Sequence, residues 1–156
     1  MALEDIVSNE MSKMEGFLLN LLGFANRPIE MGGNAAVVID NSGIGAYDFG
    51  ANGDNYKLHR DVANNILAMA NKPYESLKDK VDYLRVMIHE AAHRIRFKLN
   101  KATKEYFINA IKGTKRKFGE LIERINLEES FARYAEELVL NHLGQSNNSS
   151  IWQGIG

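Results

Sequence analysis

The feature that most restricts how this chain can fold is a pair of histidines, His89 and His93, set four residues apart in a strongly helical pattern. Apolar residues recur there at three- and four-residue steps, which predicts an amphipathic helix. These positions are Leu77, Val81, Leu84, Ile88, Ala91, Ala92, Ile95 and Leu99. Residues four apart on a helix share a face, so both imidazoles can reach one metal ion. Glu90 completes an H-E-x-x-H motif, in which the glutamate lies beside the metal without binding it.

The composition narrows the choice of fold and of metal ligands. The chain has 156 residues, 45% of them apolar, which suits one domain with a hydrophobic core. It contains no cysteine, so a metal must be held by histidine and carboxylate. The net charge of −1 gives no overall reason to expect a nucleic acid or membrane partner.

The N-terminal residues match neither a transmembrane segment nor a secretory signal peptide. The longest apolar run, residues 17–25, is too short to span a bilayer. It follows an acidic N-terminus, whereas a secretory signal peptide begins with positive charge. We therefore expect a soluble, cytoplasmic protein with no signal peptide or transmembrane segment.

Periodicity and turn residues predict an α+β order of elements. We expect a helix over 3–25, three short strands near 35–39, 44–49 and 56–59, a helix over 60–71, the motif helix, and further helices ending with one over 127–143. Glycine-rich turns between the strands favour a small antiparallel meander. We interpret residues 1–144 as a single domain and the Gly-, Ser- and Asn-containing stretch 145–156 as a polar tail.

The stretch from Arg94 to Lys117 is strongly basic. It holds nine lysines and arginines against one acid, Glu105. Such a stretch can steer an acidic partner or a nucleic acid. Its aromatic residues fit helical core spacing and are few for base stacking, so nucleic acid binding is disfavoured. We interpret the stretch as a solvated face.

A catalytic zinc ion usually takes three protein ligands, so a third must come from elsewhere in the chain. The downstream carboxylates at a plausible distance are Glu120, Glu123, Glu128, Glu129, Glu136 and Glu137. In the last predicted helix, Glu128 lies next to the apolar face and Glu129 nearer its edge, so periodicity does not choose between them. Asn126 and Glu129 also fit a capping box, in which the glutamate caps the helix instead.

The two motifs together resemble a known family. His89-Glu90-Ala91-Ala92-His93, followed by Glu129-Ser130-Phe131-Ala132, resembles the gluzincin branch of the zincin metalloproteases. The resemblance is nearest to anthrax-lethal-factor-like domains and ImmA/IrrE-like metallopeptidases, and it covers mainly residues 80–140. It implies a zincin-like fold with an N-terminal helix, a small antiparallel or mixed sheet whose edge binds substrate, and a helix-rich C-terminal half that carries the metal ligands.

The resemblance also implies an activity and roles for individual residues. His89, His93 and Glu129 would bind Zn²⁺, and Glu90 would act as the general base of a peptidase that cleaves a protein or peptide substrate. The family's acidic residue one turn after the third ligand is replaced by Arg133. No tyrosine precedes Glu129 by about two turns, so Tyr134, Tyr106 and His142 are the candidates to stabilise the transition state.

A second hypothesis is a binding protein. The short chain and the missing family residues also fit a zincin-fold accessory factor, associated with a phage or a toxin, that has little or no hydrolytic activity. Such a factor would engage an acidic partner through the 94–117 basic stretch.

Overall fold

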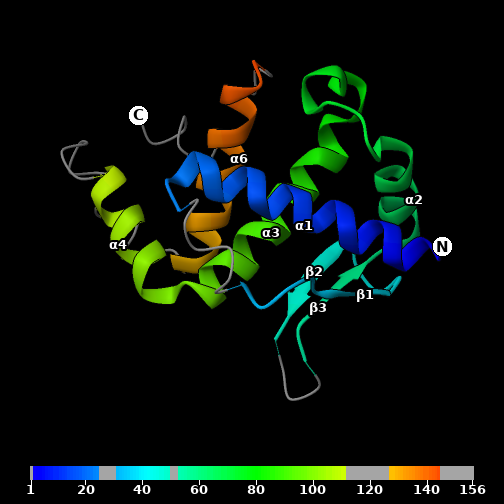
Figure 1. Ribbon diagram of the computed structural model, residues 1–156, viewed down its shortest axis with the longest axis horizontal. Helices are drawn as coiled ribbons and strands as arrows, with labels where there is room; N and C mark the ends of the chain where they lie inside the picture. The colour runs from blue at the N-terminus through cyan, green and yellow to red at the C-terminus, as the bar shows by residue number, and fades with distance from the viewer. Residues whose placement is uncertain (1, 25–30, 50–52, 112–126, 145–156) are drawn as a thin grey trace.

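The chain begins with a long amphipathic helix, α1 (Leu3–Leu22), as its sequence predicts. The computed structural model describes residues 2–24, 31–49, 53–111 and 127–144 (Figure 1). The face of α1 that packs on the core carries Val7, Met11, Met14, Leu18 and Leu22. The helix ends at Gly23, where a φ of 83° turns the chain so that the amide of Phe24 donates to the carbonyl of Leu19.

Three short strands form one mixed sheet. They are β1 (Ala36–Ile39), β2 (Gly45–Asp48) and β3 (Asn55–Leu58), in the order β1-β3-β2. β2 pairs with β3 antiparallel, and β1 pairs with β3 in parallel. The three strands thus lie close to their predicted positions.

The predicted antiparallel meander is wrong, because β1 does not pair with β2. β3 takes the central position, and its two inward side chains, Tyr56 and Leu58, are fully buried. β1 contributes one buried side chain, Val37, and β2 contributes none. The strand with the most core-forming residues therefore lies between the other two, and β2 becomes an edge strand.

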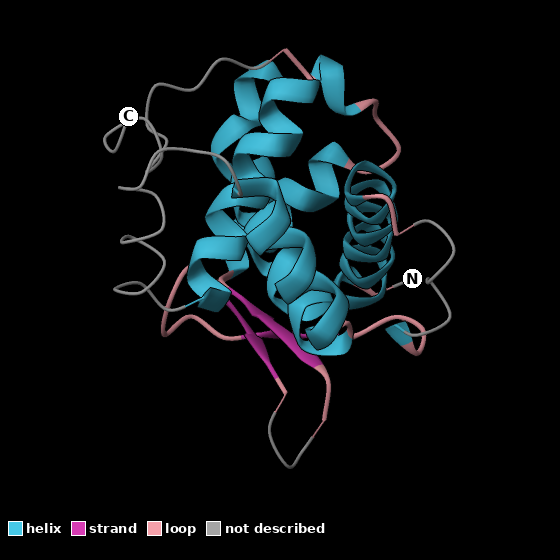
Figure 2. Cartoon of the chain, turned by 90° about the vertical axis from the view of Figure 1, so that its left-hand side faces the viewer, coloured by secondary structure: helices cyan, strands magenta, loops and turns pink. Residues whose placement is uncertain are grey.

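α3 (Val81–Lys98), which carries the histidine motif, is the central helix. It packs against α1, α2, α4, α6 and β2. The other helical elements are α2 (Arg60–Met69), the short 3₁₀ turns η2 (Tyr74–Ser76) and η3 (Lys78–Lys80), α4 (Asn100–Ile111) and α6 (Leu127–His142). The helices gather on one side of the sheet (Figure 2). α3 thus lies between the sheet and α6, and this position brings residues from all three together.

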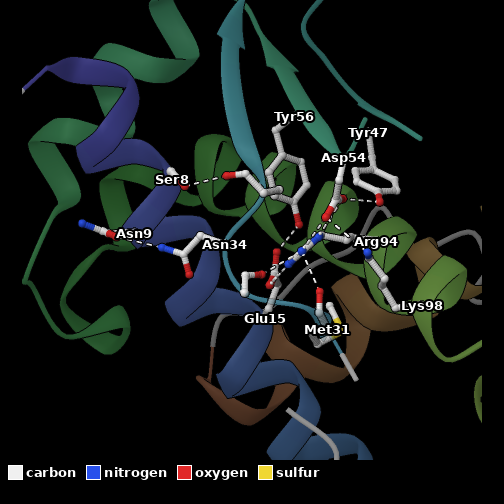
Figure 3. A network of polar contacts seen from close by, with 12 residues as sticks. Ser8, Asn9, Glu15, Met31, Asn34, Tyr47, Asp54, Tyr56, Arg94 and Lys98 are labelled. Atoms are coloured by element: carbon white, nitrogen blue, oxygen red, sulfur yellow. Dashed lines mark hydrogen bonds and ion pairs between the residues drawn. The ribbon is translucent and has the colours of Figure 1, made fainter. Parts of the chain in front are cut away.

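A buried arginine joins the sheet to the motif helix (Figure 3). Arg94 is 0% exposed, and its guanidinium binds Glu15 of α1 at 2.7 Å and both carboxylate oxygens of Asp54 at 2.7 and 3.0 Å. It also donates to the carbonyls of Met31 and Gly33. A buried charge is tolerated only when it is paired and hydrogen-bonded in this way. The contacts hold α1, the 31–33 segment and the start of β3 against α3.

The predicted solvated basic face over 94–117 is therefore wrong in part. Arg94 is buried in this network, Arg96 is only 6% exposed, and Lys98 lies 3.3 Å from Asp54. Each of these cations follows the histidine motif on α3, which packs on several neighbours. Lys101 and Lys104 are exposed, and residues 112–117 lie outside the described residues. An acidic partner would thus meet fewer cations than the sequence suggests.

Expectations about a membrane span, the C-terminal tail and the helix cap can be compared with the structure only where residues are described. None of the helices in the described part of the chain has the length and apolar character needed to cross a membrane. The tail predicted over 145–156 and the proposed cap Asn126 lie outside the described residues.

Candidate metal centre

α3 and α6 bring two imidazoles and one carboxylate close together. Nε2 of His89 lies 3.2 Å from Nε2 of His93, and these two nitrogens lie 3.1 and 3.2 Å from the two carboxylate oxygens of Glu129. Among the described residues, His89, His93 and Glu129 form a cluster that can hold a metal ion. All three side chains are partly exposed, so an ion can reach them from solvent.

The spacing of these atoms fits a small tetrahedral cation. An ion bound at about 2.0–2.1 Å with tetrahedral angles holds its ligand atoms about 3.3–3.4 Å apart. The 3.2 Å between the two histidine nitrogens, and the 3.1 and 3.2 Å from each of them to one carboxylate oxygen of Glu129, are close to this value. All three side chains line the cleft described below, from which water or a substrate oxygen can complete the coordination. Two imidazole nitrogens and one carboxylate at these distances therefore fit a tetrahedral zinc ion.

Glu136 fixes the orientation of the first histidine. Its carboxylate accepts a hydrogen bond from Nδ1 of His89 at 2.7 Å and pairs with Arg85 at 3.2 Å. A carboxylate can only accept, so the proton of a neutral His89 lies on Nδ1, and the lone pair of Nε2 points at the cluster. From the sequence alone, Glu136 is a candidate only as a third metal ligand. Its spacing of seven residues from Glu129, two helical turns, is the signal that places it on the same face.

The two histidines differ in proton affinity. Burial disfavours the charged form of His89, but Glu136, Glu90 and Glu129 outweigh this effect and raise its pKa. Burial, together with the charge of His89, lowers the pKa of His93 despite the nearby Glu129. A histidine that stays neutral keeps the lone pair that a metal requires.

Glu90 lies beside the cluster without being part of it. Its side chain is 7% exposed and faces β2, where the backbone amide of Tyr47 hydrogen-bonds to it. β2 packs tightly here, since a Cβ on Gly45 would lie 3.3 Å from Val86 and 3.6 Å from Glu90. Burial raises the pKa of Glu90 to about 7, against the charge of His89, which lowers it. A carboxyl group with such a pKa can both accept and return a proton near neutral pH.

A cleft of about 420 Å³ runs past these groups. Its lining residues are Gly45, Ala46, Tyr47, Phe49, His89, Glu90, His93, Phe97, Glu128 and Glu129. We call it the metal cleft. A smaller hollow of about 270 Å³ shares His89, Glu90 and Glu129 with it and extends toward Arg85 and Arg133. The edge of β2 thus faces the candidate metal site across an open space.

No known protein family, curated protein or solved structure matches this chain. Any function must therefore be inferred from the geometry of the metal cleft itself.

The structure separates the remaining candidates for the site. Glu128 is exposed and lines the metal cleft, but it is not part of the ligand cluster. The ring of Tyr134 packs edge-on against Tyr106 and Phe107, and His142 packs against Phe17 of α1. The described residues that line the metal cleft do not include Tyr134, Tyr106 or His142. Their predicted role in the transition state thus gains no support from their positions.

Replacing Glu136 by Ala is expected to weaken metal binding by about 10- to 100-fold, because His89 loses the contact that fixes its ring. Glu136→Gln should have a smaller effect, since its amide oxygen can still accept from Nδ1. Titration with zinc against a chromophoric chelator measures both variants. Glu105→Ala, an exposed glutamate on α4, serves as the control. An unchanged affinity in Glu136→Ala would show that the carboxylate does not support the ligand.

Proposed function

We propose that this chain is a zinc-dependent peptidase with a zincin-like site. The observation that carries the proposal is the convergence of His89, His93 and Glu129 on one point, with Glu90 beside them under the edge of β2. Two imidazoles and one carboxylate form a ligand set of catalytic zinc, and the absence of cysteine excludes thiolate ligation. When bound, zinc supplies Lewis acidity and lowers the pKa of water.

The residues of the chain supply the proton transfers. Glu90 accepts a proton from the attacking water and then delivers it to the leaving amine. The amide of Tyr47 holds the carboxylate in place beside the cluster. Glu136 and Arg85 keep the ring of His89 in one orientation during these steps.

The edge of β2 offers a place for an extended peptide. The carbonyl of Ile44 accepts from the amide of His59 on the β3 side. Along an antiparallel strand, successive residues point their backbone N–H and C=O groups alternately toward and away from the partner strand. Since Ile44 bonds to β3, the backbone groups of Gly45 and Tyr47 point away from β3. The amide of Tyr47 already donates to Glu90, so a peptide that lies along the metal cleft as an added strand pairs with the backbone groups of Gly45 and with the carbonyl of Tyr47. Its backbone then passes the metal site and Glu90.

Metal removal tests the proposal. Purified protein loaded with zinc is expected to carry one ion per chain and to cleave members of a peptide mixture, as detected by mass spectrometry. A strong chelator should stop cleavage, and added zinc should restore it. The proposal fails if the chain takes up no stoichiometric zinc. If it binds zinc but cleaves no peptide, the zincin-like binding protein replaces the peptidase.

A further inference from the structure

Two phenylalanines beside the metal site are exposed and stacked on each other. Phe49, which follows β2, is 50% exposed, and Phe97 of α3 is 43% exposed. Their ring centroids lie 4.4 Å apart with an angle of 23° between the planes. Single exposed apolar residues are ordinary on a protein surface, but a stacked pair that lines a cleft marks a binding surface.

Tyr47 extends this surface, and a hydrogen bond from its hydroxyl group fixes its position. Its ring lies 5.9 Å from Phe49 and 6.1 Å from Phe97, measured between centroids. Its hydroxyl donates to Asp54, which the buried Arg94 holds in turn (Figure 3). We call Tyr47, Phe49 and Phe97 the aromatic wall. The wall is therefore anchored to the network that joins the sheet to α3.

The aromatic wall lies close to the metal ligands. Phe97 follows His93 by four residues on α3, so the two side chains are neighbours on one helix face. A substrate side chain that touches Phe97 must therefore belong to a residue within one or two positions of the bond that is cut. The wall acts on the same part of the substrate as the metal.

The opposite end of the groove has different chemistry. Beyond His89 the smaller hollow is lined by Arg85, Arg133 and Asp82, together with Ile44. The guanidinium of Arg133 is about half exposed and lies 3.8 Å from Glu129. Among the described residues, the end next to His93 carries the stacked Phe49 and Phe97, whereas the other end sets the exposed Ile44 beside charged side chains, so the two ends differ mainly in charge.

We propose that the aromatic wall binds a large apolar side chain, aromatic or aliphatic, of a peptide substrate next to the cleaved bond. This inference rests on the proposed peptidase function and names its substrate class. Burying one such side chain raises kcat/KM for that peptide by about 10- to 100-fold over a peptide with a small polar residue there. Phe97 is then a specificity-determining residue, while His89, His93, Glu129 and Glu90 act on every substrate.

The experiment uses synthetic peptides in which one position is fixed as Phe, Leu, Ser, Asp or Lys. The zinc-loaded wild type should prefer Phe and Leu at one position beside the cut, and Phe97→Ala should lose this preference. Phe97→Leu should keep most of it. Ile108→Ala, which removes an equally exposed apolar side chain from α4, should leave it unchanged. Zinc content and thermal melting confirm that each variant is folded.

Two outcomes overturn the inference: cleavage by the wild type with no apolar preference, or the same preference in Phe97→Ala. A third is self-association of the wild type that Phe97→Ala abolishes while peptide preference stays unchanged, since the wall would then contact a second copy of the chain.

A binding measurement separates this inference from the peptidase proposal. The same peptides are titrated onto zinc-loaded Glu90→Gln and onto Glu90→Gln with Phe97→Ala. If the wild type cleaves nothing but Glu90→Gln still binds Phe and Leu peptides through Phe97, the peptidase proposal fails and the apolar subsite stands. If neither cleavage nor selective binding occurs, both fail.

Discussion

Replacing Glu90 by Gln is expected to lower kcat/KM for peptide cleavage by about 10²- to 10⁴-fold while the chain still binds one zinc ion. Glutamine has nearly the same shape, and its amide oxygen can still accept from the backbone amide of Tyr47. It cannot take a proton from water. Because Glu90 is outside the ligand cluster, the metal site itself should be unaffected.

The measurement combines zinc analysis with kinetics on a peptide that the wild type cleaves. Glu105→Gln makes the same chemical change at an exposed position on α4 and serves as the matched control. Cleavage at the wild-type rate in Glu90→Gln would exclude Glu90 as the base, whatever the metal content. Loss of zinc in this variant would instead show that the carboxylate contributes to binding.

The motif helix and the approach of its two histidines could be predicted because both depend on short-range geometry. The apolar repeat around His89 and His93 determines which side of α3 packs inward, and a spacing of four residues brings the two rings to one point. Glu129 was predicted only through the family resemblance, because the apolar pattern of α6 did not distinguish it from Glu128. Adjacent residues on a helix point about 100° apart, so the rotation of α6 about its axis decides which carboxylate meets the histidines.

The packing of α6 supplies this missing information. Phe131, Ala135 and Val139 are fully buried, and Phe131 lies edge-on to Phe107 of α4. These contacts set the rotation of α6, and that rotation directs Glu129 and Glu136 toward α3. Such contacts join residues far apart in sequence, so no local pattern reports them.

The sheet topology and the buried arginine were also beyond local patterns. Turn residues near 40–43 suggested that β1 and β2 form a hairpin, but the two buried side chains of β3 favoured a central place for that strand. Arg94 resembled a solvated cation because its partners Glu15 and Asp54 lie 79 and 40 residues away in sequence. The aromatic wall depends on the same long-range contacts, since Phe49 and Phe97 meet only after the sheet has docked on α3.

Replacing Glu129 by Ala is expected to weaken zinc binding by more than about 100-fold, beyond the effect of losing a residue that only supports a ligand. With this side chain removed, only the two imidazoles remain in the cluster, and two ligands do not form a stable zinc site. Cleavage should fall with the metal content. Zinc analysis after dialysis against a weak chelator measures the loss.

Glu128→Ala is a closely matched control for this variant. Both glutamates lie in the first turn of α6, where a negative charge stabilises the helix by about 0.3–1 kcal/mol, so both variants lose a similar amount of stability. Both also line the metal cleft, so the two changes alter its charge equally. Only Glu129 places carboxylate oxygens 3.1 and 3.2 Å from the histidine nitrogens. Loss of zinc in Glu128→Ala with retention in Glu129→Ala would reverse the ligand assignment and require α6 to be rotated about its axis.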